Sequence, residues 1–253
     1  MSSTTHLVNL SVAIMLSLSV SQQGTALQAD GNRKTGPGND KDCCAVEVGL
    51  PGFTSRPGAS ETPPANSTLT DVPRHVYGNP NADVRVIVYE DLQCPDCAVF
   101  GDMIENFLLR PYGGSVAIEI RDFPLPKHSW AREAAIVARF LETKDSQLAA
   151  GFRRRMRQSI DAVSRNGFKN ALASFCRKNR LDVAELEAAL INPRYADAVD
   201  SDFRQGFEMG IRKTPTVIVG DSKFIETIDL GRLRSAIEQQ LTAARLARQG
   251  AVK

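Results

Sequence analysis

Short apolar runs and amphipathic stretches follow one another from residue 77 to residue 242, and together they predict an α/β fold. Residues 84–89 are β-branched and aromatic, which is the composition of a central strand covered on both faces. Apolar residues between 99 and 108 recur at helical spacing, with polar residues on the other side. Residues 116–120 alternate between apolar and smaller or polar side chains, as a second strand would. A right-handed crossover would place the two strands parallel in one sheet.

A long helical block is predicted to interrupt the sheet. One helix is expected from about 129 to 141, and residues 145–210 continue with helical periodicity. This stretch is expected to break at Pro193 and to close with a short helix near 203 to 209. Its basic run, residues 153–157, is interpreted as a solvated helix face rather than as a binding site for an anionic partner.

After the helical block the pattern returns to strands. Residues 217–219 and 224–225, separated by a Gly-Asp turn, predict a β-hairpin, and apolar residues from 230 to 241 predict a last helix capped by Asp229. Pro215 stands just before a strand that looks central, although proline cannot donate to a ladder. A cis peptide bond opposite an active site would resolve this anomaly.

Length and composition indicate how the whole chain is organised into segments. With 253 residues, 42% of them hydrophobic, the chain can bury one sizeable core with extensions. Residues 7–20 form a short apolar run followed by small and polar residues, which predicts a secretory signal cleaved near 26–29. The run is shorter than the ~20 apolar residues that span a bilayer, and an uncleaved membrane anchor is the alternative. A periplasmic or other extracytoplasmic location is therefore expected.

The stretch after the signal is dominated by Gly, Pro, Ser, Thr, Asn and Asp, a composition that cannot bury enough apolar area to fold. We interpret it as a tether. It contains the adjacent Cys43 and Cys44, which are either partners for a regulatory bond or thiols of little consequence. The predicted organisation is a signal peptide at 1–28, a disordered linker at 29–75, a folded domain at 76–246 with a helical insertion at about 127–210, and a flexible tail at 247–253.

The charge balance says little about partners. The chain has 31 basic and 29 acidic residues and a formal net charge of +2, which gives no reason to expect nucleic acid as a partner. The chemistry must come from the cysteines. Of these, Cys176 lies among apolar residues and is interpreted as a buried structural thiol.

Cys94-Pro95-Asp96-Cys97 forms a Cys-x-x-Cys motif between the first predicted strand and its helix. Unpaired N–H groups and the dipole at a helix N-terminus stabilise an anion, so the pKa of Cys94 is expected to be lowered. Cys97 is expected to be more buried, with Cys94 as the exposed sulfur. A zinc site is the weaker alternative, because the chain has no second Cys-x-x-Cys and no suitable His pair. No metal or organic cofactor is expected.

The sequence resembles the DsbA-like branch of the thioredoxin superfamily, the exported thiol–disulfide oxidoreductases, over about residues 77 to 242. The resemblance is carried by residues 78–84, by residues 91–97, by Phe123-Pro124-Leu125 with His128, and by Thr214-Pro215-Thr216 followed by a hairpin. It implies a thioredoxin fold, βαβ then ββα, with an inserted helical block. It further implies that Pro215 is cis beside the two cysteines and that the Thr214 backbone pairs with an extended substrate segment.

Two departures from the family pattern concern redox behaviour. Family members often carry an acidic residue six positions before the first cysteine, where this chain has Val88, and Glu90 or Asp91 is not expected to replace it. Strongly oxidising relatives have histidine at the position of Asp96. A carboxylate disfavours a neighbouring thiolate, so Asp96 is expected to make a milder oxidant.

The resulting hypothesis is an oxidase that introduces disulfides into exported proteins with free thiols. Cys94 and Cys97 are its expected catalytic residues, Pro95 and Asp96 tune the redox pair, and Thr214 and Pro215 bind substrate. The resemblance assigns reoxidation to a membrane quinone-linked partner or to small-molecule disulfides.

Two alternatives stay open from the sequence. A disulfide isomerase or reductase would use the same fold in the other direction, although the tether does not look like the dimerisation domain that such isomerases usually carry. A non-enzymatic chaperone or adaptor would use the Pro215 groove to bind extended peptides. Replacing Cys94 by Ser would leave its activity intact, whereas an oxidase would lose all activity.

Overall fold

The structure is a computed structural model, and it describes residues 71–250. The predicted signal peptide, nearly all of the predicted linker, and Cys43 and Cys44 lie outside the described residues. Within residues 71–250, no helix has the length and apolarity needed to cross a membrane.

Five strands form one sheet, in the order β1-β3-β2-β4-β5. β2 and β3 run parallel, with Val84 opposite Val116, and the three other pairings are antiparallel. The two predicted parallel strands and the predicted hairpin are thereby confirmed. The strands are β1 (Val76–Gly78), β2 (Val84–Glu90), β3 (Val116–Asp122), β4 (Thr216–Val219) and β5 (Ser222–Ile225).

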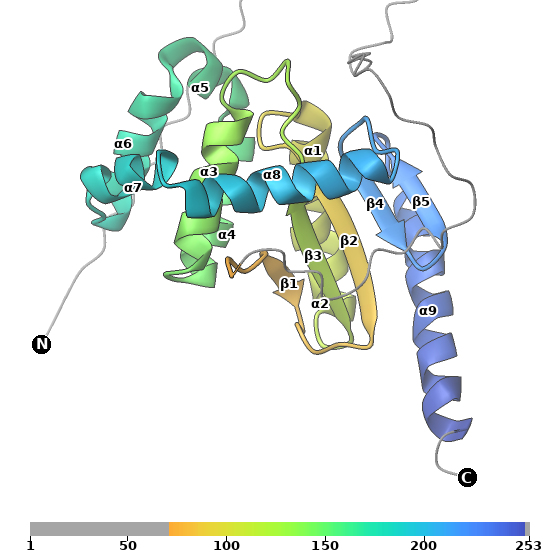
Figure 1. The fold of residues 1–253 in the computed structure, drawn as a ribbon. Helices are drawn as coiled ribbons and strands as arrows, with labels where there is room; N and C mark the ends of the chain where they lie inside the picture. The colour runs from red at the N-terminus through yellow and green to blue at the C-terminus, as the bar shows by residue number, and fades with distance from the viewer. Residues whose placement is uncertain (1–70, 251–253) are drawn as a thin grey trace, which may run out of the picture. The chain divides into compact units, whose positions relative to one another are not determined.

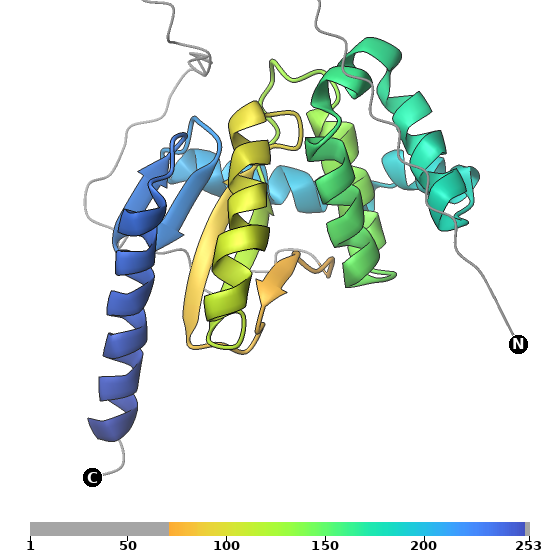
Figure 2. The same ribbon diagram turned by 180° about the vertical axis from the view of Figure 1, so that it is seen from behind.

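Helices cover both faces of the sheet. α1, η1 and α9 lie on the side of the sheet that faces the viewer in Figure 2. Their apolar side chains form one core with those of the sheet. α8 crosses the opposite face (Figure 1), where its Phe203 and Phe207 pack near Tyr89 and Phe123. The first group of helices is α1 (Pro95–Met103), the π-helix η1 (Ile104–Leu108), α2 (Leu109–Tyr112) and α9 (Leu230–Gly250).

The predicted helical block is confirmed between β3 and β4, and it has an apolar core of its own. Trp130, Ala134, Val137 and Leu141 are all buried in that core, as one face of an amphipathic helix requires. The helices of the block are α3 (Ala131–Glu142), α4 (Ser146–Arg157), α5 (Ile160–Asn166), α6 (Phe168–Asn179), α7 (Val183–Leu190) and α8 (Pro193–Glu208).

The last helix of the block is longer than predicted. α8 begins at Pro193 instead of near residue 203, because proline is tolerated in the first turn of a helix and Asn192 caps that turn. The Asn192 side chain accepts a hydrogen bond from the Arg194 N–H at 3.0 Å. Pro193 therefore starts the long helix instead of separating two short segments.

The interpretation of residues 153–157 as a solvated face is wrong for two of its arginines. Arg153 and Arg157 are 0% and 4% exposed, whereas Arg154 and Arg155 lie in solvent. Arg153 donates to Asp122 at 2.8 Å, and Arg157 donates to Glu90 at 2.9 Å. A buried arginine needs such carboxylate partners, and here they come from the ends of β2 and β3.

Candidate active site

The Cys-x-x-Cys motif lies at the N-terminus of α1, directly after the loop that follows β2. Cys94 is the N-cap of the helix with extended backbone angles, φ −82° and ψ 123°, and its side chain makes no capping hydrogen bond. Pro95 occupies the first helical position, where its missing N–H costs nothing. The helix thus begins at Pro95, and Cys97 lies in its first turn.

Both cysteine side chains are buried, at 1% exposure each, and both are free thiols. The prediction that Cys94 is the exposed sulfur is therefore wrong. The reason is tertiary: the Cys94 thiol donates a hydrogen bond to the Thr214 carbonyl oxygen at 3.3 Å, and this residue stands 120 positions later in the chain. The chain around Thr214 covers the sulfur that the local sequence would leave open.

The two thiols differ strongly in acidity. The Cys97 thiol donates to the Cys94 sulfur, and this is the main reason that the pKa of Cys94 falls from 9.0 to about 6. The Thr214 hydroxyl and the backbone N–H of Cys97 also lower the pKa of Cys94, while burial and the Asp91 carboxylate oppose the fall. The direction agrees with the prediction from the helix N-terminus.

Burial raises the pKa of Cys97 well above its ordinary value, and the negative charges of Cys94 and Glu90 add to the rise. Near neutral pH the reduced pair therefore consists of a Cys94 thiolate and a Cys97 thiol. Because of this asymmetry, Cys94 can leave as a thiolate, whereas Cys97 retains its proton.

Thr214 and Pro215 reach the motif because β4 pairs with β2. Tyr89 lies opposite Thr216, so the residues just before β4 stand beside the end of β2 and the cysteines that follow it. The Thr214–Pro215 peptide bond is cis, as the resemblance implied. Thr214 is fully buried.

Asp91 and His128 lie close together, and their contact was not predicted from the sequence. The His128 Nδ1 lies 2.7 Å from the Asp91 Oδ2, and their side chains are 15% and 0% exposed. The backbone N–H of Asp91 also donates to the Cys97 sulfur at 3.4 Å. Two features of the sequence could have indicated this contact: Asp91 is three residues before Cys94, and the rigid Phe123-Pro124-Leu125 connection leads to His128.

Pro95 and Asp96 are exposed on the first turn of α1. Asp96 lines a hollow together with Val99 and Met103 of α1 and the chain from Glu226 to Ile228. Val99 is 65% exposed, which leaves an apolar surface next to the motif.

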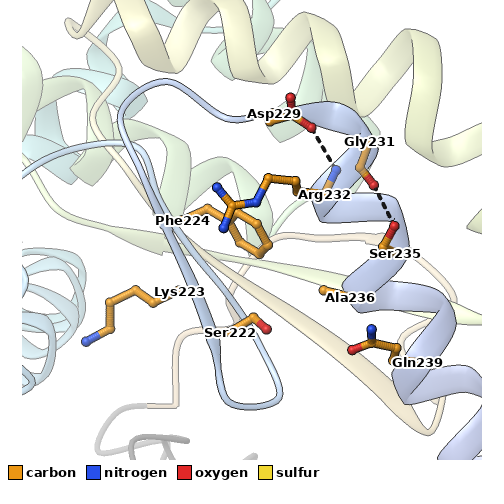
Figure 3. A pocket seen from close by; sticks show the side chains of 9 residues that line it. All are labelled: Ser222, Lys223, Phe224, Asp229, Gly231, Arg232, Ser235, Ala236 and Gln239. Carbon is orange, nitrogen blue, oxygen red and sulfur yellow. Dashed lines mark hydrogen bonds between the residues drawn. The ribbon is translucent and has the colours of Figure 1, made fainter.

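A second hollow lies between β5 and the first turns of α9 (Figure 3), and none of its lining residues belongs to the motif. Asp229 accepts a hydrogen bond from the Arg232 N–H there at 2.7 Å, which confirms its predicted role as a cap. No group of three or more His, Cys, Asp or Glu side chains suited to a metal ion occurs among residues 71–250.

Comparisons with known proteins agree with this architecture. A family model described as Thioredoxin matches residues 70–239. None of the curated proteins matches the chain significantly.

Solved structures share the fold at low sequence identity. The thiol-disulfide exchange protein alpha-DsbA2 from Wolbachia pipientis is 18% identical over 67% of this chain and 88% of its own, with a TM-score of 0.56. Oxidised BdbD from Bacillus subtilis is 20% identical over 67% of this chain and 93% of its own, with a TM-score of 0.55. The catalytic domain of Proteus mirabilis ScsC is 19% identical over 69% of this chain and 92% of its own, with a TM-score of 0.54. The predicted DsbA-like thioredoxin fold is confirmed.

Proposed function

The chain belongs to the thioredoxin family, and we propose that it introduces disulfides into exported proteins by dithiol–disulfide exchange at Cys94 and Cys97. The observation that carries the proposal is the asymmetric pair: a Cys94 whose pKa is about 6 beside a Cys97 whose pKa is raised. A stabilised Cys94 thiolate stabilises the reduced form of the enzyme and therefore favours an oxidant. A similar structure is that of a thiol-disulfide exchange protein, which supports the same chemistry.

The reaction starts from the Cys94–Cys97 disulfide. A substrate thiolate attacks the Cys94 sulfur, a mixed disulfide forms, and the bond between Cys94 and Cys97 breaks. Cys97 leaves with the electron pair and takes up a proton, because burial makes its thiolate unstable. Attack at Cys94 is favoured by its place at the start of α1, next to the exposed Pro95 and Asp96.

A second substrate thiolate then attacks the substrate sulfur of the mixed disulfide. The substrate disulfide forms, and Cys94 leaves as the thiolate that the Cys97 thiol stabilises by hydrogen bonding. Two electrons have passed from the substrate dithiol to the enzyme. No cofactor takes part, and the reduced enzyme returns to the disulfide through a membrane reoxidase or a small-molecule disulfide.

The neighbouring residues have supporting roles in this proposal. Thr214 and Pro215 hold the extended substrate segment next to Cys94, where the Thr214 carbonyl already contacts the sulfur. Pro95 begins the helix, and Asp96 places a carboxylate beside Cys94 that makes the enzyme a milder oxidant. Substrates are exported proteins with free thiols, and the working location is the periplasm or another extracytoplasmic space.

The redox potential tests the direction of electron flow. The full chain is equilibrated with glutathione buffers of graded ratio, and its reduced fraction is measured by trapping free thiols. A potential of about −120 to −180 mV is expected of an oxidase. A potential near that of thioredoxin, about −270 mV, would contradict the proposal and favour a reductase.

Substrates are identified with Cys97→Ala, which retains the Cys94 thiolate but cannot resolve a mixed disulfide by internal attack. Reaction with oxidised exported proteins is expected to leave them covalently bound through Cys94. Cys94→Ser is the matched control, because it cannot form that bond. Oxidation of a reduced model substrate by Cys94→Ser would instead contradict the role of Cys94 as the thiol that forms the mixed disulfide.

A further inference from the structure

Asp91 contacts Cys97 through its backbone N–H, and its carboxylate acts electrostatically on Cys94. Its N–H donates to the Cys97 sulfur at 3.4 Å, at the point where β2 passes into the active-site loop. Its carboxylate opposes the negative charge of Cys94, and it is fully buried. A single residue therefore contacts one sulfur and acts electrostatically on the other.

Three donors hold the Asp91 carboxylate in one place. The backbone N–H of Gln93 reaches Oδ1 at 2.7 Å, and that of Leu125 reaches Oδ2 at 2.7 Å. His128 Nδ1 also lies 2.7 Å from Oδ2, and because a carboxylate only accepts, this ring nitrogen carries the proton. The loop after β3 thus fixes the position of a charge that belongs to the loop after β2.

The other carboxylates near the pair are compensated or solvated. Glu90 acts on Cys97, but it accepts hydrogen bonds from the guanidinium groups of Arg153 and Arg157 at 3.2 and 2.9 Å. Asp96 stands in solvent, where water screens its field. The donors to the Asp91 carboxylate are instead two backbone amides and one imidazole.

We propose, as an extension of the function proposed above, that Asp91 is a positioning residue for the redox pair: held by His128, its buried carboxylate sets how readily Cys94 keeps a negative charge. Asp91 outweighs Asp96 in this role because it is buried and fixed. The carboxylate destabilises the reduced enzyme and so limits its oxidising strength.

The test measures the pKa of Cys94 in the reduced full chain from thiolate absorbance at 240 nm. Cys94→Ser supplies the baseline of the other four cysteines. Asp91→Asn removes the charge with little change of shape, and the pKa of Cys94 is expected to fall by about one pH unit. That tenfold change corresponds to a redox potential about 30 mV more oxidising.

Asp96→Asn is the matched control, since it removes the same charge from an exposed position two residues after Cys94. Its effect on the pKa of Cys94 is expected to be less than a third of that of Asp91→Asn. An unchanged or higher pKa in Asp91→Asn, or an equal effect of both variants, would overturn the proposal.

His128→Gln tests the same proposal if Asp91→Asn does not fold. With one donor weakened, the Asp91 charge is less compensated, and the pKa of Cys94 is expected to rise. A fall or no change would contradict the role of His128. Because these measurements need no substrate, the proposal can fail while the oxidase activity stands, and the reverse holds as well.

Discussion

The hydrogen bond from the Cys97 thiol to the Cys94 sulfur leads to a quantitative prediction. Cys97→Ala removes the donor that contributes most to the low pKa of Cys94. The whole fall from 9.0 to about 6 spans about three pH units, or about 4 kcal/mol. A hydrogen bond to a charged group contributes about 1.5–3 kcal/mol, which corresponds to about one to two of these units. The pKa of Cys94 in Cys97→Ala is therefore expected at about 7 to 8.

The assay is the rate of Cys94 alkylation as a function of pH, because only the thiolate reacts. Cys97→Ser is the matched control: its hydroxyl can still donate, so its pKa is expected between those of the wild type and Cys97→Ala. If the pKa of Cys94 in Cys97→Ala stays within half a unit of the wild-type value, the Cys97 thiol is not the main cause of the low pKa. In that case the Thr214 hydroxyl and the helix N-terminus, which the variant retains, would be the dominant causes.

Three further predictions concern stability. Asp122→Asn removes one of the two buried carboxylates that each of Arg139 and Arg153 contacts, since Arg139 also pairs with Asp202 and Arg153 with Glu90. The loss is expected to be about 3–5 kcal/mol in urea unfolding, against less than about 1 kcal/mol for Asp200→Asn in an exposed pair. Gly206→Ala would place a Cβ 2.7 Å from the Tyr89 ring, and a loss of about 1–3 kcal/mol is expected; no loss on thermal unfolding would show that the rings can yield. Folding lowers the pKa of Cys94, so above pH 9 the free energy of unfolding of the reduced chain is expected to exceed that of Cys94→Ser. This difference is expected to vanish as the pH falls towards 6, and a difference that grows in acid would contradict the low pKa of Cys94.

Much of the fold could be predicted from local patterns. The β-branched run of β2, the alternation in β3 and the hairpin of β4 and β5 each depend on the side chains of one short segment, and all three were placed correctly. The motif at the start of α1 was predicted in the same way, because a strand, two cysteines and an amphipathic helix are contiguous in the chain.

Local patterns failed where a side chain depends on a partner from a distant segment. The basic run of α4 has the composition of a solvated face, yet Arg153 and Arg157 are buried by carboxylates at the ends of β3 and β2. The charge of a buried arginine is stabilised only when its partner is near in space, and such nearness has no periodicity in the sequence.

The active site divides in the same way. The contiguous sequence is enough to place Cys94 and Cys97 together at a helix start, where N–H groups favour a thiolate. The tertiary structure alone decided the surroundings of these sulfurs: Thr214 covers Cys94, and His128 holds Asp91 beside the pair. The physical reason is that hydrogen bonds and charges act over a few ångströms of space, and only the pairing of β2 with β4 and the loop after β3 bring these residues within that range.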